Sequence, residues 1–211
     1  MTIAIFGGTG GIGKIIIHKA LDKGYRVNAY VRNPDKLNIN HPNLHVIKGE
    51  LDNYDNIKNT ISGSDVVIST LGPPLLYKYK GQPLLIGHKL IIQSMKELNI
   101  LRFITLATPS VKSEKDKRSF ATILPGIIAR LIYPSAYKEI IDIGKTVVAS
   151  NLDWTIIRII APNDNPPINN IKVSFGDIKI KFAISRADIA DFILEQITNK
   201  SYIRLMPIIG S

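Results

Sequence analysis

The chain has 211 residues, of which 45% are hydrophobic, so it is long enough for one well-buried core and too short for two domains of ordinary size. It contains no cysteine, which excludes disulfides, thiol catalysis and cysteine-ligated metals and fits a reducing compartment. The formal net charge of +10 raises the question of an anionic partner, although lysines scattered along a chain are usually solvated. We therefore expect a single domain over residues 1–211.

The N-terminus passes from the start methionine directly into an apolar run, TIAIF, without the basic region and cleavage site of a signal peptide. Even the most apolar segment, ATILPGIIARLIYP, is interrupted by Pro125 and Arg130, so its uncharged run is too short to span a bilayer. We expect a cytoplasmic protein without a membrane partner.

Up to Thr108, apolar runs alternate with amphipathic segments. Five runs are typical of buried strands: TIAIF, YRVNAYV, NLHVIKG, SDVVISTLG and LRFITLAT. The spacing of apolar residues predicts helices in KIIIHKALDKG, NYDNIKNTISG and GHKLIIQSMKELNI. Strands that alternate with helices predict an α/β protein with a doubly wound, parallel, Rossmann-type sheet.

After Thr108 the alternation loosens. The segments expected there are a charged loop in PSVKSEKDKRS, a helix up to Tyr133, a second helix from about Ser135 to Ser150, and a sixth strand in LDWTIIRII. A short β pair is predicted for IKVSF and IKIKFAI, and a closing helix for SRADIADFILEQIT with Ser185 as its N-cap. The part after the sixth strand is small, so we expect a C-terminal extension and no separate substrate domain.

Two nucleotide-binding motifs overlap in GGTGGIGK. A P-loop for a nucleoside triphosphate needs Ser or Thr after its lysine to bind magnesium, but Ile15 stands there. In a dinucleotide motif, Gly7 makes the turn out of the strand, Gly10 lets a pyrophosphate approach the backbone, and Gly13 permits close helix–sheet packing. The strand–turn–helix context agrees with the second motif, so the sequence predicts dinucleotide binding.

The end of the second strand indicates which dinucleotide binds. NAD sites usually place Asp or Glu about 20 residues after the glycines, where it binds the ribose 2′-hydroxyl. Here Arg32 follows Gly13 by 19 residues, and Asn33 comes next. Because a guanidinium suits a 2′-phosphate, we predict NADP(H), with NAD(H) less favoured. The alternative is a solvent-facing arginine in a turn.

Two lysine-rich loops follow the fourth and fifth strands and therefore leave the carboxyl edge, where open α/β sheets bind ligands: LLYKYKGQ and VKSEKDKRS. Lys78 and Lys80 would form a basic rim that favours a small anionic acceptor. The alternative is two solvated loops, because Glu114 and Asp116 dilute the second cluster. No helix or sheet face concentrates the charge with interleaved aromatic residues, so we expect no nucleic-acid partner.

A metal site is not expected. His41 and His45 have a metal-like spacing in HPNLH, but no third ligand stands near them in the sequence.

Several of these segments together resemble the atypical short-chain dehydrogenase/reductase proteins of NmrA-like, NAD(P)H-binding type, closest in layout to flavin reductase/biliverdin reductase B. The resemblance covers nearly the whole chain and rests on TIAIFGGTGGIG, VRNP, VIKGELDN, DVVISTLG, NLDWTIIR and ISRADIADFIL.

The resemblance implies roles for individual residues. Those that would hold the pyrophosphate are Gly7, Thr9, Gly10, Gly11, Ile12 and Gly13. Those beside the 2′-phosphate and the adenine would be Arg32, Asn33, Glu50 and Leu51. Those beneath the nicotinamide would be Thr70, Leu71 and Gly72, with Thr108 facing the ring as the candidate catalytic residue.

The chain departs from the family's catalytic pattern. Extended short-chain enzymes carry Tyr-x-x-x-Lys on the helix after the fifth strand, where the lysine lowers the pKa of the tyrosine. Here that spacing occurs only at Tyr54 and Lys58, after the third strand, so we interpret it as a surface pair. Ile159 also stands where the family has a proline after the sixth-strand arginine.

Relatives close to the flavin reductases manage without this tyrosine, because reducing a flavin requires hydride delivery more than a dedicated acid. The resemblance therefore implies an NADPH-dependent oxidoreductase that passes a hydride to a flavin, a quinone or a similar conjugated acceptor. The alternative is a non-catalytic NADP(H)-sensing regulator of NmrA-like type. A nucleotide-sugar epimerase or dehydratase is disfavoured by the missing tyrosine–lysine pair.

Overall fold

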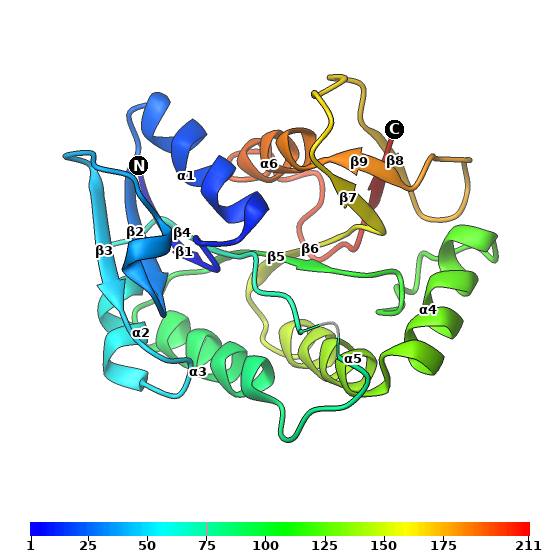
Figure 1. Cartoon of the computed structure of the whole chain (residues 1–211), viewed down its shortest axis with the longest axis horizontal. Coiled ribbons are helices and arrows are strands. Elements are labelled where there is room, and N and C mark those ends of the chain that lie inside the picture. The colour runs from blue at the N-terminus through cyan, green and yellow to red at the C-terminus, as the bar shows by residue number, and fades with distance from the viewer. Residues whose placement is uncertain (75) are drawn as a thin grey trace.

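The structure is a computed structural model that describes residues 1–74 and 76–211. The described strands form an eight-stranded sheet with helices on both faces and a second sheet of two short strands (Figure 1). Leu75, the first residue of the predicted loop LLYKYKGQ, lies outside the described residues. The layers are those of the predicted Rossmann-type α/β class, which the structure confirms.

Six parallel strands make up most of the large sheet. They are β1 (Thr2–Phe6), β2 (Arg26–Val31), β3 (Leu44–Lys48), β4 (Val66–Ser69), β5 (Arg102–Ala107) and β6 (Asp153–Arg158). Their order in space is β3-β2-β1-β4-β5-β6, so the chain reverses its direction of winding between β1 and β4. The pairing is parallel throughout, with Ile5 beside both Ala29 and Ile68, so all six strands end at one edge of the sheet.

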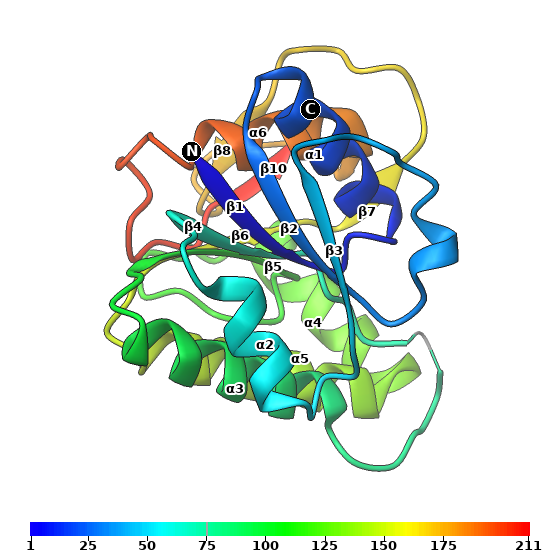
Figure 2. The same ribbon diagram turned by 90° about the vertical axis from the view of Figure 1, so that its left-hand side faces the viewer.

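Helices cover both faces of the sheet. On one face lie α1 (Gly11–Asp22) and α6 (Arg186–Glu195), and on the other α2 (Tyr54–Ile61), α3 (Pro83–Glu97) and α5 (Pro134–Val148) (Figures 1 and 2). Ile3 and Ile5 of β1 belong to the first core, whereas Ala4 and Phe6 belong to the second. The central strands β1 and β4 are apolar at nearly every position because both faces of a parallel sheet are buried, whereas the edge strand β3 exposes His45 and Lys48.

The start of α3 differs from the sequence-based expectation, because the helix begins at Pro83 and not at Gly87. Proline suits the first position of a helix, where its missing amide proton costs no hydrogen bond. The buried carboxylate of Glu139 on α5 accepts hydrogen bonds from the amides of Leu84 and Leu85, at 2.7 and 3.1 Å. A partner from a distant helix therefore caps α3, and the local sequence did not show it.

The predicted β pair between IKVSF and IKIKFAI is wrong. The remaining described elements are η1 (Pro34–Lys36), α4 (Phe120–Ile132), β7 (Ala161–Asn163), β8 (Lys172–Ser174), β9 (Ala183–Ser185) and β10 (Ile208–Gly210). β8 pairs with β10, and β9 pairs with β7. β10, which the sequence analysis missed, extends the large sheet beside β6 and offers β8 an antiparallel partner. Partners distant in sequence therefore replace the local pair.

Candidate functional site

The carboxyl edge of the sheet brings the sequence-predicted residues together. Glu50 follows β3, Arg32 follows β2, Gly7 follows β1, Thr70 follows β4 and Thr108 follows β5. Since these strands are neighbours in that order, the residues form a row along one edge, close to the reversal between β1 and β4. Ligands of open α/β sheets bind at such a point.

The glycine turn between β1 and α1 is closed by backbone contacts. Gly7 has φ +87°, which a residue with a side chain rarely adopts, and its carbonyl accepts a 3.0 Å hydrogen bond from the amide of Gly10. A Cβ atom on Gly13 would lie 2.3 Å from the Gly7 carbonyl oxygen and 2.9 Å from the Cα of Gly8. The helix can approach the turn this closely only because Gly13 has no side chain.

The first turn of α1 is open to an anion. The helix begins at Gly11, earlier than the predicted Lys14, and its N-cap Gly10 has no side chain to bind the free amides. The first turn, which includes Ile12, contains no acidic residue that would neutralise the positive end of the helix dipole. Thr9 in the turn is only half-buried. These features fit a phosphate group, which the amides of a helix N-terminus bind well.

Thr70 supports the glycine turn. Its hydroxyl donates to the carbonyls of Gly7 (3.1 Å) and Phe6 (3.3 Å), and its amide donates to Phe6 (2.9 Å). The hydroxyl is therefore occupied by the protein itself. Leu71 and Gly72 continue along the edge, and a Cβ atom on Gly72 would meet open space.

Thr108 differs from Thr70 because its hydroxyl is buried and has no hydrogen-bond partner among the described residues. Buried hydroxyls are normally hydrogen-bonded, and the hydroxyls of Thr105 and Ser110, on either side of Thr108, also lack a partner among the described residues. The place of Thr108 beside the nicotinamide stays a prediction.

At the other end of the row, Arg32 is exposed and makes no hydrogen bond or ion pair within the described part of the chain. Asn33 is used structurally, since its side-chain oxygen accepts from the amide of Asp35 (3.0 Å) and caps η1. The Tyr30 hydroxyl donates to the carbonyl of Glu50 (2.6 Å), and burial raises the pKa of Tyr30 to about 12. Because Arg32 is exposed and has no partner among the described residues, its guanidinium is available to a 2′-phosphate.

Leu51, the other predicted adenine contact, packs against α3. A Cβ atom on Gly87 would lie 3.0 Å from the Cβ of Leu51, so the two segments touch closely. Its side chain is half-buried and leaves part of its surface at the edge.

A buried histidine lies beneath the row, and the sequence analysis did not assign it a role. His88 on α3 has its Nε2 3.1 Å from the hydroxyl of Ser69 and its Nδ1 2.7 Å from the carbonyl of Leu84. A neutral ring that donates from Nδ1 and accepts at Nε2 satisfies both contacts. Burial lowers the pKa of His88 from 6.5 to about 4. Ser69 immediately precedes Thr70, so this pair supports the end of β4.

The Tyr-x-x-x-Lys spacing lies away from this edge. Lys58 on α2 forms a 2.6 Å ion pair with Glu97 on α3, and the Tyr54 hydroxyl donates to the same carboxylate. The Lys58 and Glu97 side chains are each 40% exposed. This agrees with the interpretation of a surface pair, so among the described residues the Tyr-x-x-x-Lys spacing supplies no acid at the edge.

The first lysine-rich loop is anchored, although its lysines are not. The Tyr79 hydroxyl donates to Glu139 on α5 (2.5 Å), and burial together with this carboxylate raises the pKa of Tyr79. Lys78 and Lys80 are exposed, and the Lys78 ammonium lies 5.4 Å from the centre of the Tyr77 ring. Tyr79 therefore holds the loop against α5, while the side chains of Lys78 and Lys80 are exposed to solvent.

The second lysine-rich loop differs from its sequence-based description. Asp116 does not dilute the surface charge, because it forms a two-pronged ion pair with Arg158 of β6, at 2.6 and 2.7 Å. Arg158 is fully buried and also donates to the carbonyls of Val111 and Met206. Lys112 donates to the carbonyl of Thr122, and burial lowers its pKa. The loop is thus tied to the protein interior.

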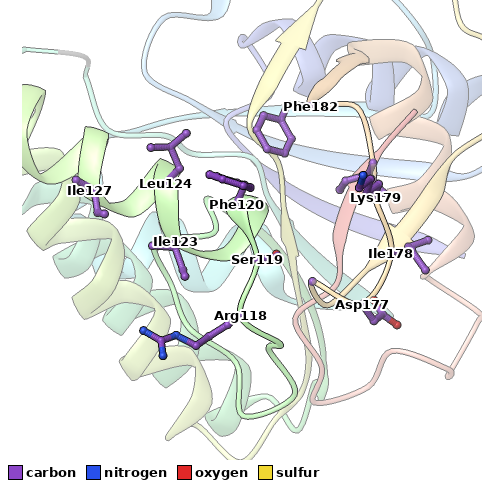
Figure 3. Close-up of a pocket in the computed structure, with 12 residues that line it drawn as sticks. Arg118, Ser119, Phe120, Ile123, Leu124, Ile127, Asp177, Ile178, Lys179 and Phe182 are labelled. Atoms are coloured by element: carbon purple, nitrogen blue, oxygen red, sulfur yellow. The ribbon is translucent and has the colours of Figure 1, made fainter.

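An apolar pocket of about 890 Å³ lies between α4 and the segment 176–182 (Figure 3). Its described lining is Arg118, Ser119, Phe120, Ile123, Leu124, Ile127, Gly176, Asp177, Ile178, Lys179, Ile180 and Phe182. None of these residues was predicted as a site residue, although the strongly apolar sequence of α4 could have indicated an apolar surface there. A Cβ atom on Gly126 would lie 3.7 Å from the Cα of Ser110, so α4 packs on the chain just beyond Thr108.

Within residues 1–74 and 76–211, His, Asp and Glu side chains form no group of three that could hold a metal ion. His41 instead accepts a hydrogen bond from the amide of Asn43 (3.1 Å). In the same part of the chain, no helix has the length and the apolar character needed to cross a membrane.

The fold and the row of residues at its edge define a dinucleotide-binding protein of the Rossmann type. The sequence model for NAD(P)H binding matches residues 7–200, and the chain belongs to this NAD(P)H-binding family. The predicted resemblance to atypical short-chain dehydrogenase/reductase proteins is thereby confirmed.

Two curated relatives match part of the chain. Phenylcoumaran benzylic ether reductase 1 of Arabidopsis thaliana is 32% identical over 166 residues, which make up 74% of this chain and 47% of that protein. The photosystem II assembly factor Ycf39 of Cyanophora paradoxa is 31% identical over 110 residues, or 49% of this chain and 33% of that protein. The chain therefore spans less than half the length of either relative.

A solved structure shares the fold. A short-chain dehydrogenase/reductase from Veillonella parvula, in complex with NADP, has a TM-score of 0.79 at 16% identity over 100% of this chain and 94% of that chain.

Proposed function

We propose that this protein is an NADPH-dependent reductase that passes a hydride to a flavin, a quinone or a similar conjugated acceptor. The observation that carries the proposal is the set of residues at the carboxyl edge of the sheet. The start of α1 after β1, Arg32 after β2 and the Thr108 hydroxyl after β5 have no side-chain partner among the described residues. The order of these features along the edge supports a dinucleotide whose pyrophosphate lies at α1. A bound nicotinamide supplies the hydride.

The protein's residues would bind and orient the cofactor. Amides at the start of α1 hold the pyrophosphate, and Arg32 holds the 2′-phosphate that distinguishes NADP(H) from NAD(H). Thr108 contributes a hydrogen bond at the nicotinamide end, with Thr70 and the His88–Ser69 pair fixing the backbone beneath. No tyrosine–lysine acid lies at this edge in the described residues, so an acceptor that needs only a hydride and a solvent proton fits best.

The surroundings support a conjugated, amphipathic acceptor. The apolar pocket beside α4 contains the aromatic rings of Phe120 and Phe182 and one cation on each wall, Arg118 and Lys179. Lys78 and Lys80 add exposed positive charge on the loop after β4. A flat ring system with an acidic group would match both features.

The proposal includes a cytoplasmic location and a small-molecule partner, without nucleic acid or membrane. The absence of cysteine fits a reducing compartment. Against a nucleic-acid partner, the Tyr79 hydroxyl between the two lysines of the first loop is bound to Glu139, and Asp116 of the second loop is bound to the buried Arg158.

A non-catalytic NADP(H) sensor is the second candidate. It is favoured by the position of Tyr54 and Lys58, which are bound to Glu97 on the surface, so within the described part of the chain this pair supplies no acid at the nicotinamide end. Turnover separates the two functions. The rate of NADPH oxidation, followed by absorbance, should rise with at least one acceptor in a panel of quinones, flavins and aldehydes. A protein that binds NADPH and oxidises it with none of them is the sensor.

The cofactor assignment is tested through Arg32. One charge-assisted hydrogen bond contributes about 1.5–3 kcal/mol, so Arg32→Ala should reduce the preference for NADPH over NADH by about ten- to a hundredfold. Arg32→Asp should reduce it further, because a carboxylate repels the 2′-phosphate and accepts a bond from the ribose hydroxyl of NADH. Fluorescence titration with both reduced cofactors measures the ratio.

Arg26 supplies a matched control, because it is an exposed arginine at the opposite end of the same strand. Arg26→Ala should leave the ratio unchanged. Lys36 lies close to Arg32 in sequence and could mask part of the effect, so the Arg32/Lys36 double alanine variant should show the full loss. If the wild type binds both cofactors equally, the assignment to NADP(H) fails.

A further inference from the structure

Arg186, the first residue of α6, lies across the start of α1. An ideal Cβ atom built on Gly11 would lie 2.8 Å from Cδ and 2.9 Å from Nε of Arg186. The arginine therefore runs directly over the first residue of the helix whose amides face the proposed pyrophosphate site. Neither the glycine motif nor the spacing to β2 indicates this neighbour, because the two residues lie on opposite ends of the sequence.

The position of Arg186 is fixed by the start of α6. Ser185 caps the helix by accepting from the amide of Asp188 (2.9 Å) and donates to its carboxylate (2.8 Å). The carboxylate of Asp188, which is buried, also accepts from the amides of Ile168 and Asn169, both at 3.1 Å. The Asp188 side chain thus joins the N-cap of α6 to the loop at residues 168–169, and α6 packs along α1. The backbone of Arg186 has little freedom to move away from Gly11.

The guanidinium, in contrast, is held only weakly. Its Nη1 lies 2.6 Å from the carboxylate of Asp164, which follows β7. The Asp164 side chain is 86% exposed, and that of Arg186 is 28% exposed. Exposed ion pairs contribute little to stability, so an anion of higher charge can replace this partner.

We propose that Arg186 binds the pyrophosphate of the dinucleotide and that Asp164 is its counter-ion in the free protein. The inference rests on the proposed dinucleotide site and adds a charged ligand to an anion site otherwise made of backbone amides. A guanidinium forms short, charge-assisted hydrogen bonds with phosphate oxygens, often in pairs. On binding, Arg186 exchanges the Asp164 carboxylate for the phosphate, while its stem remains over Gly11.

Arg186 and Arg32 should then have separable effects. The pyrophosphate is common to NADPH and NADH, whereas the 2′-phosphate belongs to NADPH alone. Loss of Arg186 should weaken both cofactors by the same factor, about tenfold or more for one charge-assisted hydrogen bond. Loss of Arg32 should weaken NADPH alone.

The experiment measures dissociation constants for NADPH, NADH, ADP-ribose and adenosine 2′-monophosphate by calorimetry or by competition with NADPH fluorescence. Arg186→Ala should weaken ADP-ribose, which contains the pyrophosphate, and leave adenosine 2′-monophosphate unchanged. Arg32→Ala should give the reverse pattern. Arg186→Lys should retain part of the affinity, since a point charge remains without the paired geometry. Lys23→Ala, an exposed cation at the far end of α1, is the control for general charge loss.

A variant of the counter-ion gives an independent test. Asp164→Asn removes the competing carboxylate and its repulsion of the ligand, so it should tighten both cofactors by a few-fold. Because Asp164 is exposed, this variant should fold normally even if Arg186→Ala does not.

The outcomes separate the two proposals. If the wild type binds neither NADPH nor NADH, the proposed function is wrong. If the wild type binds them but Arg186→Ala binds ADP-ribose as well as the wild type does, the assignment of Arg186 is wrong and the cofactor site stands. If Arg186→Ala is unfolded by circular dichroism, unchanged affinities in both Arg186→Lys and Asp164→Asn overturn the assignment.

Discussion

The part of the chain up to Thr108 and the part after it are built in different ways. In the first part, strands alternate with helices, the central strands β1 and β4 are almost fully buried, and neighbours in sequence are close in space. In the second part, α4 exposes much of its apolar surface, and the short strands pair with partners distant in sequence. Polar groups buried between distant segments, above all Arg158 with Asp116, organise this part. Local pattern positions the first part, which carries most of the proposed cofactor site and is called the cofactor half below. Long-range polar contacts position the second part, which contains the pocket proposed for the acceptor and is called the acceptor half.

The largest effect is expected from Asp116→Ala. It leaves the Arg158 guanidinium buried without its carboxylate, which should lower the free energy of unfolding by about 3–5 kcal/mol. Urea denaturation measures the loss. Glu114→Ala on the same loop is the control, because Glu114 is exposed and should change stability little. Equal stability of the two variants would mean that the acceptor half is not held by this ion pair.

The next effect concerns a buried polar pair in the cofactor half. The pKa of His88 is lowered from 6.5 to about 4, so the unfolded chain binds a proton that the folded chain does not between these values. Stability should therefore fall as the pH decreases from about 6.5 to about 4, by on the order of 3 kcal/mol. Urea titrations across this range measure the slope.

Variants of two histidines isolate this contribution. His88→Gln should remove most of the slope, whereas His18→Gln, which changes an exposed histidine on α1, should leave it intact. A slope that survives in His88→Gln must come from other groups.

Gly13→Ala tests how tightly the cofactor half is packed. The added methyl group would meet the Gly7 carbonyl and the Gly8 backbone, which cannot move as a side chain can. We expect a loss of about 1–3 kcal/mol in stability, together with weaker NADPH binding. Gly72→Ala, where the methyl group meets open space, should leave the melting temperature unchanged. Normal stability of Gly13→Ala would contradict the close approach of α1 to the turn.

The smallest effect is expected for the exposed lysines. The Lys78→Ala/Lys80→Ala variant should raise the KM for FMN a few-fold and leave that for uncharged riboflavin nearly unchanged, and added salt should reduce the difference. Steady-state kinetics at low and high salt measure it. Equal wild-type kinetics with the two flavins at low salt would remove these lysines from the acceptor site.

Much of the cofactor half could be predicted because its signals are local. A glycine with positive φ, a helix start without a cap and an arginine after the second strand are each visible in a few consecutive residues. Parallel pairing then places the strand ends at one edge, so the row from Glu50 to Thr108 follows from topology. The hydrogen bonds of the two threonine hydroxyls could not be predicted, because Thr70 and Thr108 have the same side chain and differ only in the groups around them.

The sequence by itself determined the doubly wound sheet, the glycine turn and the position of Arg32, since period and spacing along the chain specify them. Only the tertiary structure decided that Asp116 pairs with Arg158, that β8 joins β10, and that Arg186 lies over Gly11. The members of each pair are far apart in the sequence, and the charge or hydrogen-bonding capacity of one residue does not specify which partner it meets. Folding brings them together, because a buried charge or an unpaired strand edge needs a partner wherever the chain supplies one.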